Sequence, residues 1–350
     1  MLKRSARRAL VALGLLIGLA TSSRAQDTPV PVSLGGGLRT SFVHTEPDAG
    51  DGTDAFALDS ARLYISGTAS KNIKFMFNTE YNGPANTVNV LDAVAQIAVS
   101  PKFNVWFGRF LPPSDRANLY GPYYASHWAV YTDGVQDGYP FVFQGRDNGA
   151  AYWGQFGMVK LSGGIFDGAT ATGDDTVITA GRIQVDFWDS EAGYYLNGTY
   201  YGDKNLLALG LAGQVQGGDK SAYNVDFLLE RKVGMGGAYT VEAEWAKYDK
   251  LGGYSASYTS DDGGYVLGAY LFPKMVGQGR FQALAKYAFA RFRDGVALAN
   301  VDFDQKTTEL NLNYVIKQFN ARVMVFFKDT RFTAVRSDAK QFGVGMQIQM

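Results

Sequence analysis

Phe342-Gly343-Val344-Gly345-Met346-Gln347-Ile348-Gln349-Met350 has an apolar residue at every second position and glycine or glutamine between them. Since successive side chains of a β-strand point to opposite faces, this stretch has one apolar face and one polar face. Segments of the same kind follow one another along the chain, with almost no helical pattern between them. The pattern predicts an all-β fold, a transmembrane antiparallel β-barrel with lipid outside and water inside.

The period of two predicts about sixteen strands, and one further segment is ambiguous. Residues 194–201 could form a seventeenth strand, but bacterial single-chain barrels have even strand numbers, so we interpret this segment as an elongated turn or strand extension. The strands are expected at 33–43, 57–68, 72–81, 89–99, 102–110, 147–155, 157–166, 177–187, 205–216, 221–232, 236–248, 262–273, 279–292, 304–316, 319–331 and 339–350.

The breaks between strands alternate in length. Short breaks are expected on the periplasmic side and long ones outside, because outer-membrane barrels have short periplasmic turns. The long breaks lie at 44–56, 111–146, 249–261 and 293–303.

The first 25 residues differ from the rest in composition. Lys3, Arg4, Arg7 and Arg8 precede an apolar run, and small residues follow it up to Ala25. This order is typical of a cleaved signal peptide, with 26–350 as the mature barrel domain. An uncleaved anchor helix is disfavoured because the apolar run is short for a membrane span.

Composition excludes several classes of function. Without the five basic residues of the signal segment, 28 Lys and Arg stand against 33 Asp and Glu, which argues against nucleic acid as a partner. There is no cysteine, so disulfides play no part. No run of 18 apolar residues follows the signal segment, which argues against a transmembrane helix there.

The longest break, 111–146, is rich in proline and aromatic residues. A long loop of this kind is usually functional or disordered, and its aromatic content argues against disorder. We expect it to fold into the barrel and narrow the channel; the alternative is an ordered cap on the outer rim. The expected constriction residues are Pro112, Pro113, Asp115, Tyr120, Tyr123, Tyr124 and Trp128.

Three motifs carry a resemblance to a known family. They are Gly108-Arg109-Phe110-Leu111-Pro112-Pro113, Ala61-Arg62-Leu63-Tyr64-Ile65-Ser66-Gly67 and Gly198-Thr199-Tyr200-Tyr201-Gly202-Asp203-Lys204. With them the chain resembles the phosphate-selective porin O/P family of Gram-negative outer membranes. The resemblance implies a sixteen-stranded, homotrimeric porin with its constriction in the third loop, and arginines and lysines along the channel in phosphate-selecting members. In this chain the loop is nearly balanced, with Arg116 and Arg146 against Asp115, Asp133 and Asp137.

Odd and even positions of a strand place their side chains on opposite faces, and we call this the parity of a residue. Strand parity assigns charged side chains to the lumen. A basic wall is expected from Arg39, Arg62, Lys74, Arg109, Arg116 and Arg322, although Arg109 has lipid-facing parity and needs a bend to turn inward. An acidic wall is expected opposite, from Asp226, Glu230, Glu242 and Glu244. The two walls could set up a transverse field, or each charge could pair with a neighbouring strand.

Catalytic and metal-binding patterns are weak. His44 and His127 both fall in expected loops, and no metalloprotease, P-loop or EF-hand motif is present. We therefore expect neither an enzyme nor a cofactor. The predicted function is passive diffusion of small hydrophilic solutes, in a narrower version anions or phosphate, across a bacterial outer membrane. Its lipid and lipopolysaccharide are the expected partners. The alternative is a plugged barrel that acts as an adhesin or anchor.

Overall fold

The computed structural model describes residues 31–128, 145–168, 176–234, 236–252, 257–297, 301–334 and 336–350. The described chain from Val32 onward forms sixteen strands, one at each predicted place. They are β1 (Val32–Pro47), β2 (Thr53–Ser70), β3 (Ile73–Asn82), β4 (Thr87–Ser100), β5 (Phe103–Phe110), β6 (Asp147–Phe156), β7 (Val159–Phe166), β8 (Ile178–Asp186), β9 (Leu206–Gln216), β10 (Lys220–Val233), β11 (Gly237–Asp249), β12 (Tyr258–Leu271), β13 (Arg280–Gly295), β14 (Phe303–Lys317), β15 (Ala321–Phe332) and β16 (Ala339–Gln349).

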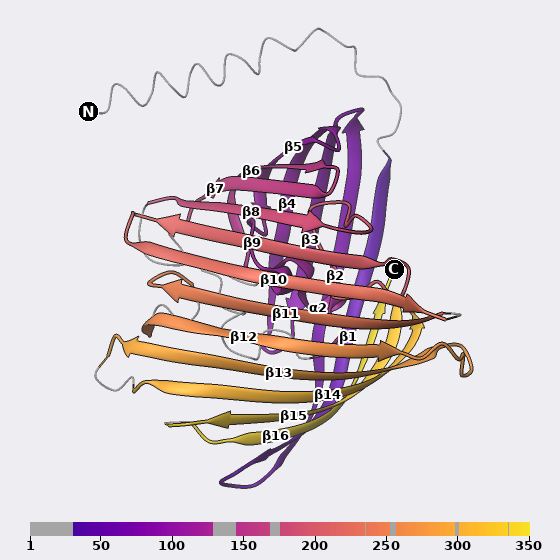
Figure 1. Ribbon diagram of the computed structural model, residues 1–350, viewed down its shortest axis with the longest axis vertical. Coiled ribbons are helices and arrows are strands. Elements are labelled where there is room, and N and C mark those ends of the chain that lie inside the picture. The colour runs from indigo at the N-terminus through magenta and orange to yellow at the C-terminus, as the bar shows by residue number, and fades with distance from the viewer. Residues whose placement is uncertain are drawn as a thin grey trace. The chain divides into compact units, whose positions relative to one another are not determined.

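The strands form a closed antiparallel barrel in which each strand pairs with its neighbours in sequence (Figure 1). The last strand closes on the first, in a register that runs from Gly37 opposite Gln349 to Pro47 opposite Ala339. Closure pairs the backbone groups that an open edge would leave exposed. The predicted fold class is confirmed.

Burial follows the predicted alternation. On β16, Phe342, Val344 and Met346 are exposed on the outer face, whereas Gly343 and Gly345 are buried on the inner face. The inner face carries most of the charged residues of the strands, so the polar side of each strand points into the barrel. This arrangement suits an apolar solvent outside the barrel.

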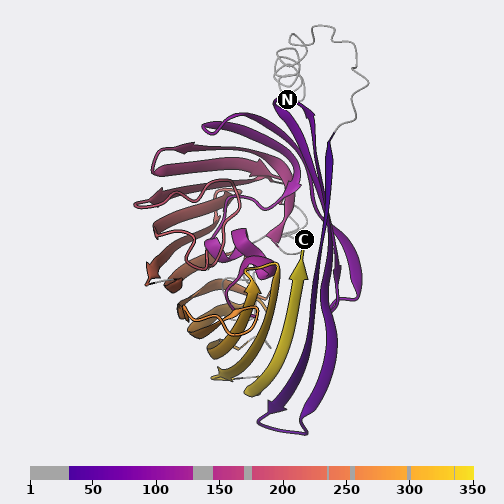
Figure 2. The same ribbon diagram turned by 90° about the vertical axis from the view of Figure 1, so that its right-hand side faces the viewer.

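A kinked helix, α2 (Arg116–Tyr124), lies inside the ring of strands (Figure 2). The Asp115 side chain caps it by accepting a hydrogen bond from the Asn118 amide at 2.7 Å. Gly121, with φ of 61°, interrupts the helical backbone, and Pro122 follows it. Among the described residues, no helix is long and apolar enough to cross a membrane.

Three of the predicted long loops are shorter than expected. The ladder of β1 and β2 extends into 44–56, with Phe42 against Phe56 at 4.8 Å and His44 bonded to Asp54 at 2.8 Å, so only 48–52 connect the two strands. In the same way β12, β13 and β14 extend into the predicted loops 249–261 and 293–303. Cross-strand pairs lengthen the strands where charge and turn residues suggested breaks.

The connection 187–205 is the main departure from the predicted loop lengths. It contains no strand, as predicted for 194–201, but it is a long segment at the barrel end where short turns were expected. The same end carries the short breaks 71–72, 101–102 and 157–158. A long connection at this end has consequences for the lumen.

A bulge in β4 reshapes the inner face next to β3. The pairing passes from Asn78 opposite Asp92 to Thr79 opposite Val90, which leaves Leu91 as an extra residue. Leu91 and Asp92 are both buried as a result. The bulge therefore places an apolar and an acidic side chain together on the inner wall.

Candidate functional site: the barrel lumen

The segment 111–128 extends across the lumen and hydrogen-bonds to strands on the far side of the barrel. The Tyr120 hydroxyl donates to Glu242 on β11 at 2.9 Å, and Asn313 on β14 donates to the carbonyl of Ser126 at 2.8 Å. The predicted constriction residues Pro112 and Pro113 are buried in the same segment. Residues 129–144 of the predicted constriction loop, with Asp133 and Asp137, lie outside the described part of the chain, so the prediction for the whole loop stays a prediction.

Arg116 joins three separate parts of the chain. Its guanidinium binds both carboxylate oxygens of Glu191, at 3.0 and 2.5 Å, and lies 3.5 Å from Asp226 on β10. Asp226 also pairs with Arg182 on β8 through both carboxylate oxygens. Arg116, Glu191 and Asp226 are almost completely buried. The prediction that Arg116 belongs to the basic wall is wrong, because α2 places it against the acidic wall.

The segment 187–205 enters the lumen from the opposite end and packs against α2. The Leu196 amide donates to the Leu119 carbonyl at 3.3 Å, and the Gly198 amide donates to the Tyr124 carbonyl at 2.9 Å. Glu230 on β10 anchors this segment by accepting bonds from the Thr199 hydroxyl and from the amides of residues 200 and 202. Two segments from opposite ends of the barrel are therefore locked together inside it.

Sequence reasoning missed this second inserted segment. The even strand number of bacterial barrels favours a turn or strand extension over a seventeenth strand at 194–201, and neither interpretation places the segment inside the lumen. Its length, the buried Glu191, and the aromatic pairs at Tyr194–Tyr195 and Tyr200–Tyr201 were the available signals. An acidic residue and four tyrosines would have no obvious role in a short turn at the membrane surface. In an inserted segment each of them forms a hydrogen bond or an ion pair inside the barrel.

The predicted basic wall contains arginines that are already engaged. Arg39 donates to the Trp128 carbonyl at 2.7 Å and lies 4.0 Å from the centre of the Trp128 ring. Arg322 donates to the Ala125 carbonyl and to the Gln347 side chain at 2.7 Å. Both side chains therefore hold the inserted loop, with cation–π contact in the case of Arg39.

The remaining members of the predicted basic wall separate into three cases. Arg62 pairs with Glu80 at 2.7 Å, and Tyr123 stacks on Arg62 with 4.5 Å between guanidinium and ring centre. Lys74 is exposed and has the parity of the inner face of β3. The prediction that Arg109 belongs to the basic wall is wrong. Arg109 keeps the outward parity of β5 and donates to the Val90 carbonyl at 3.1 Å.

The predicted acidic wall is buried under the inserted segments. Besides Asp226 and Glu230, Glu242 accepts bonds from the hydroxyls of Tyr120 and Tyr265, and Glu244 accepts one from the Ala117 amide at 3.4 Å. The described lumenal charges are paired at close range, as in Arg182–Asp226 and Arg116–Glu191. This arrangement favours local pairing over a transverse field between two exposed walls.

Two acidic groups of the inserted segments have opposite shifts. Burial raises the pKa of the Asp115 carboxyl to about 7, and the charge of Asp226 adds to the shift. Burial also opposes ionisation of Glu191, but the Arg116 guanidinium outweighs it and lowers the pKa of Glu191 to about 2. Glu191 is thus a permanent anion in the network, whereas Asp115 changes its charge near neutral pH.

His127 lies in a cationic environment. Its Nε2 is 3.1 Å from the Nζ of Lys286 on β13. Burial, with the nearby Lys286 and Arg322, holds the pKa of His127 well below its ordinary value. The ring is therefore neutral and accepts a hydrogen bond from the lysine.

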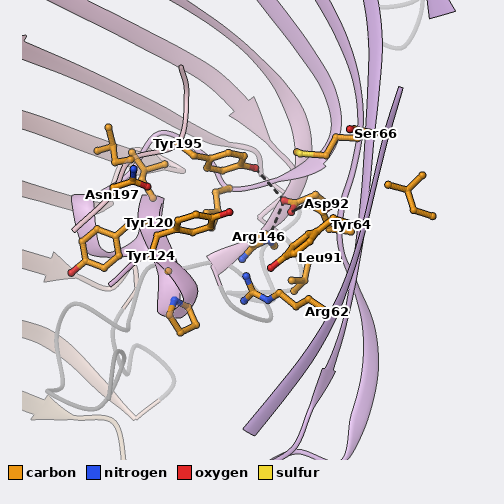
Figure 3. Close-up of a pocket in the computed structure, with 18 residues that line it drawn as sticks. Arg62, Tyr64, Ser66, Leu91, Asp92, Tyr120, Tyr124, Arg146, Tyr195 and Asn197 are labelled. Carbon is orange, nitrogen blue, oxygen red and sulfur yellow. Dashed lines mark hydrogen bonds and ion pairs between the residues drawn. The ribbon is translucent and has the colours of Figure 1, made fainter. Parts of the chain in front are cut away.

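A cavity of about 410 Å³ remains between the inserted segments and strands β2–β4. Figure 3 shows Arg62, Tyr64 and Leu91 on the strand side and Tyr124 and Asn197 on the side of the inserted segments. Arg146 and Tyr195 both donate to Asp92, at 3.1 and 3.2 Å, as the dashed lines in Figure 3 mark. This cavity gives a small solute room within the described lumen.

Comparison with known proteins supports the architecture. No family model and no curated protein matches the chain. Among solved structures, the outer membrane channel DcaP of Acinetobacter baumannii matches at a TM-score of 0.60 with 12% identity, covering 94% of this chain and 100% of that one.

Two further structures match over similar lengths. OmpF of Salmonella typhi, solved with daunomycin, matches at a TM-score of 0.58 with 12% identity, covering 91% and 97% of the two chains. OmpT, an outer membrane protein of Vibrio cholerae that was also solved in a trimer form, matches at 0.52 with 15% identity, covering 92% and 100%. At such identities the likeness shows the fold alone, and the chain has the sixteen-stranded fold of outer-membrane barrels.

Removing one member of the buried Arg116–Glu191 pair should destabilise the folded barrel. Arg116→Gln leaves Glu191 charged and buried, and we expect the free energy of unfolding in urea to fall by about 3–5 kcal/mol. Glu191→Gln in the same chain should recover part of the loss. Arg291→Gln, which breaks an exposed pair with Asp262, is the control and should cost at most about 1 kcal/mol. Equal losses for Arg116→Gln and Arg291→Gln would contradict the assignment.

Asp115 should make the stability depend on pH. Because its pKa of about 7 lies above the ordinary Asp value of about 3.9, the folded protein holds a proton that the unfolded chain releases. The stabilisation is present below about pH 4 and is lost as the pH rises to about 7. Asp115→Asn keeps a capping side chain but cannot ionise, so its unfolding midpoint should fall less between pH 5 and pH 8. Parallel pH profiles for both proteins would refute this prediction.

Proposed function

We propose that this chain is an outer-membrane porin that lets small hydrophilic solutes diffuse passively through the passage beside β2–β4. The single observation that carries the proposal is the 410 Å³ cavity, lined by charged, polar and aromatic side chains inside a closed barrel. A polar interior behind an apolar outer surface is the arrangement that a membrane channel requires.

The setting follows from the same proposal. The first 25 residues would be removed as a signal peptide, and lipid and lipopolysaccharide of a Gram-negative outer membrane would surround the apolar outer face. A homotrimer is part of the proposal; the trimer form of OmpT and the family resemblance of the sequence support it. No catalytic step is proposed.

The narrower version, a preference for phosphate or other anions, depends on the basic wall. Arg39 and Arg322 are engaged by the inserted loop, and Arg62 is paired with Glu80. The exposed Lys74 supports a mild anion preference. We therefore infer weak ion selectivity, with phosphate as one of several permeating solutes.

A second candidate is the plugged barrel, acting as an anchor or adhesin. The observation that favours it is the extent of filling: α2 and the segment 187–205 bury Arg116 and Glu191 completely and interlock through backbone hydrogen bonds. The two candidates differ in conductance. Purified protein in a planar lipid bilayer should give discrete conductance steps, and a silent bilayer would favour the plugged barrel.

The Arg62–Glu80 pair offers a test of the charge balance in the passage. In a salt gradient, Arg62→Gln should shift the reversal potential toward cation preference and Glu80→Gln toward anion preference, because each leaves its partner's charge in the wall. The double variant should return close to the starting value. Arg291→Gln, on the outer face of β13, is the control and should not change it. Identical potentials for the unaltered protein, Arg62→Gln, Glu80→Gln and the double variant would place the pair away from the ion path.

A further inference from the structure

The cavity beside β2–β4 combines two chemically different sides. The inserted segments supply rings and aliphatic side chains, among them Tyr120, Tyr124 and Tyr195, and Tyr64 on β2 adds one more ring. The lining also contains two cations, Arg62 on β2 and Arg146 in the chain just before β6 (Figure 3). A solute in the cavity therefore meets aromatic faces and charged hydrogen-bonding groups at the same time.

Each cation of the lining has a carboxylate partner. Arg62 Nε donates to Glu80 at 2.7 Å, and Arg146 Nε donates to Asp92 at 3.1 Å. Asp92 also accepts bonds from Asn78 at 2.8 Å and from Tyr195. The positive and negative charges balance, so a charged solute gains little from the cavity in exchange for the water that it loses. Hydrogen bonding to these groups is still available to a neutral solute.

The aromatic side of the cavity selects for a ring. The flat C–H face of a saturated ring packs against a tyrosine ring through dispersion and the ring's quadrupole. A purely apolar or aromatic solute would use this side but would leave the ion pairs without the water that they bind, at a cost in affinity. A solute with both a ring and many hydroxyl groups satisfies the two sides together.

We propose that this cavity is a binding subsite for a neutral, hydroxyl-rich ring of monosaccharide size, a proposal that rests on the channel function above. The ring packs on the tyrosines, and its hydroxyl groups bond to Arg62 and to the Arg146–Asp92 pair, which line the cavity. The volume of 410 Å³ falls within the roughly 300–1,000 Å³ of small-molecule sites. The subsite makes the channel selective for solutes by shape and hydroxyl pattern while it discriminates little by charge.

The test compares glucose with sorbitol, an acyclic polyol of nearly the same size and hydroxyl content. With the full barrel in a planar bilayer, glucose should reduce the single-channel current in a saturable way. Sorbitol at the same concentration should reduce it only in proportion to the change in bulk conductivity. Saturation-transfer NMR of the detergent-solubilised protein gives a second readout, in which glucose protons should receive magnetisation from the protein and sorbitol protons should not.

Substitutions at Tyr64 separate the ring from the hydroxyl. Tyr64→Leu should weaken glucose binding about 3- to 10-fold, as expected for the loss of one aromatic contact, whereas Tyr64→Phe should keep most of it. Tyr223→Leu on the outer face of β10 is the matched control and should not change glucose binding. All three variants keep an apolar residue in a strand, so the barrel should fold in each case.

Different outcomes separate this inference from the channel function. Conductance steps with identical effects of glucose and sorbitol would overturn the subsite and leave the channel intact. Saturable block by phosphate but not by glucose would also overturn it, in favour of an anion site. A silent bilayer would refute the channel, and the NMR comparison would then decide whether the cavity binds the sugar.

Discussion

Closure of β1 on β16 is the constraint on which the other features depend. A closed ladder has no free edge, and it forces every strand into one alternation of inward and outward side chains around the whole circumference. The inward-facing charged residues of many strands are thereby collected in one enclosed volume. Such a volume must be filled with water or with partners of opposite charge. In this barrel much of it is filled by α2 and the segment 187–205, which supply Arg116 and Glu191 for the strand charges.

The packing divides the lumen into two regions with different properties. On the side of β8–β15, buried carboxylates and arginines bond to one another and to the inserted backbone, so their charges stabilise the arrangement of the loops. On the side of β2–β4 the ion pairs border open space, where they can contact a solute. The inserted segments therefore decide which inward polar side chains are packed and which border open space.

The alternation in the sequence predicts the strands and the inward charges because a strand's parity is a local property, and bulges such as the one at Leu91 disturb it only locally. It also predicts the outward parity of Arg109, which the structure retains. The partners of the charges could not be derived in this way. Arg116 was assigned to the wrong wall because its position depends on the path of a non-periodic loop, and Glu191 was missed because its segment has no repeat. Parity identifies the face of the strand on which a side chain lies. The height of the side chain along the barrel axis and its distance from other charges arise only from tertiary packing.

The inner glycines of the closing strands place the rings of the inserted loop at the seam. A Cβ atom on Gly345 would lie 2.6 Å from the Trp128 ring, and one on Gly37 would lie 2.6 Å from the Tyr123 ring. These rings therefore rest on a surface that exists only after the two ends of the chain have met. Since that pairing joins residues most distant in sequence, it has the highest entropic cost and is expected to form late. Docking of the loop is then the final step of assembly, and an unclosed barrel would keep a wide, unobstructed interior.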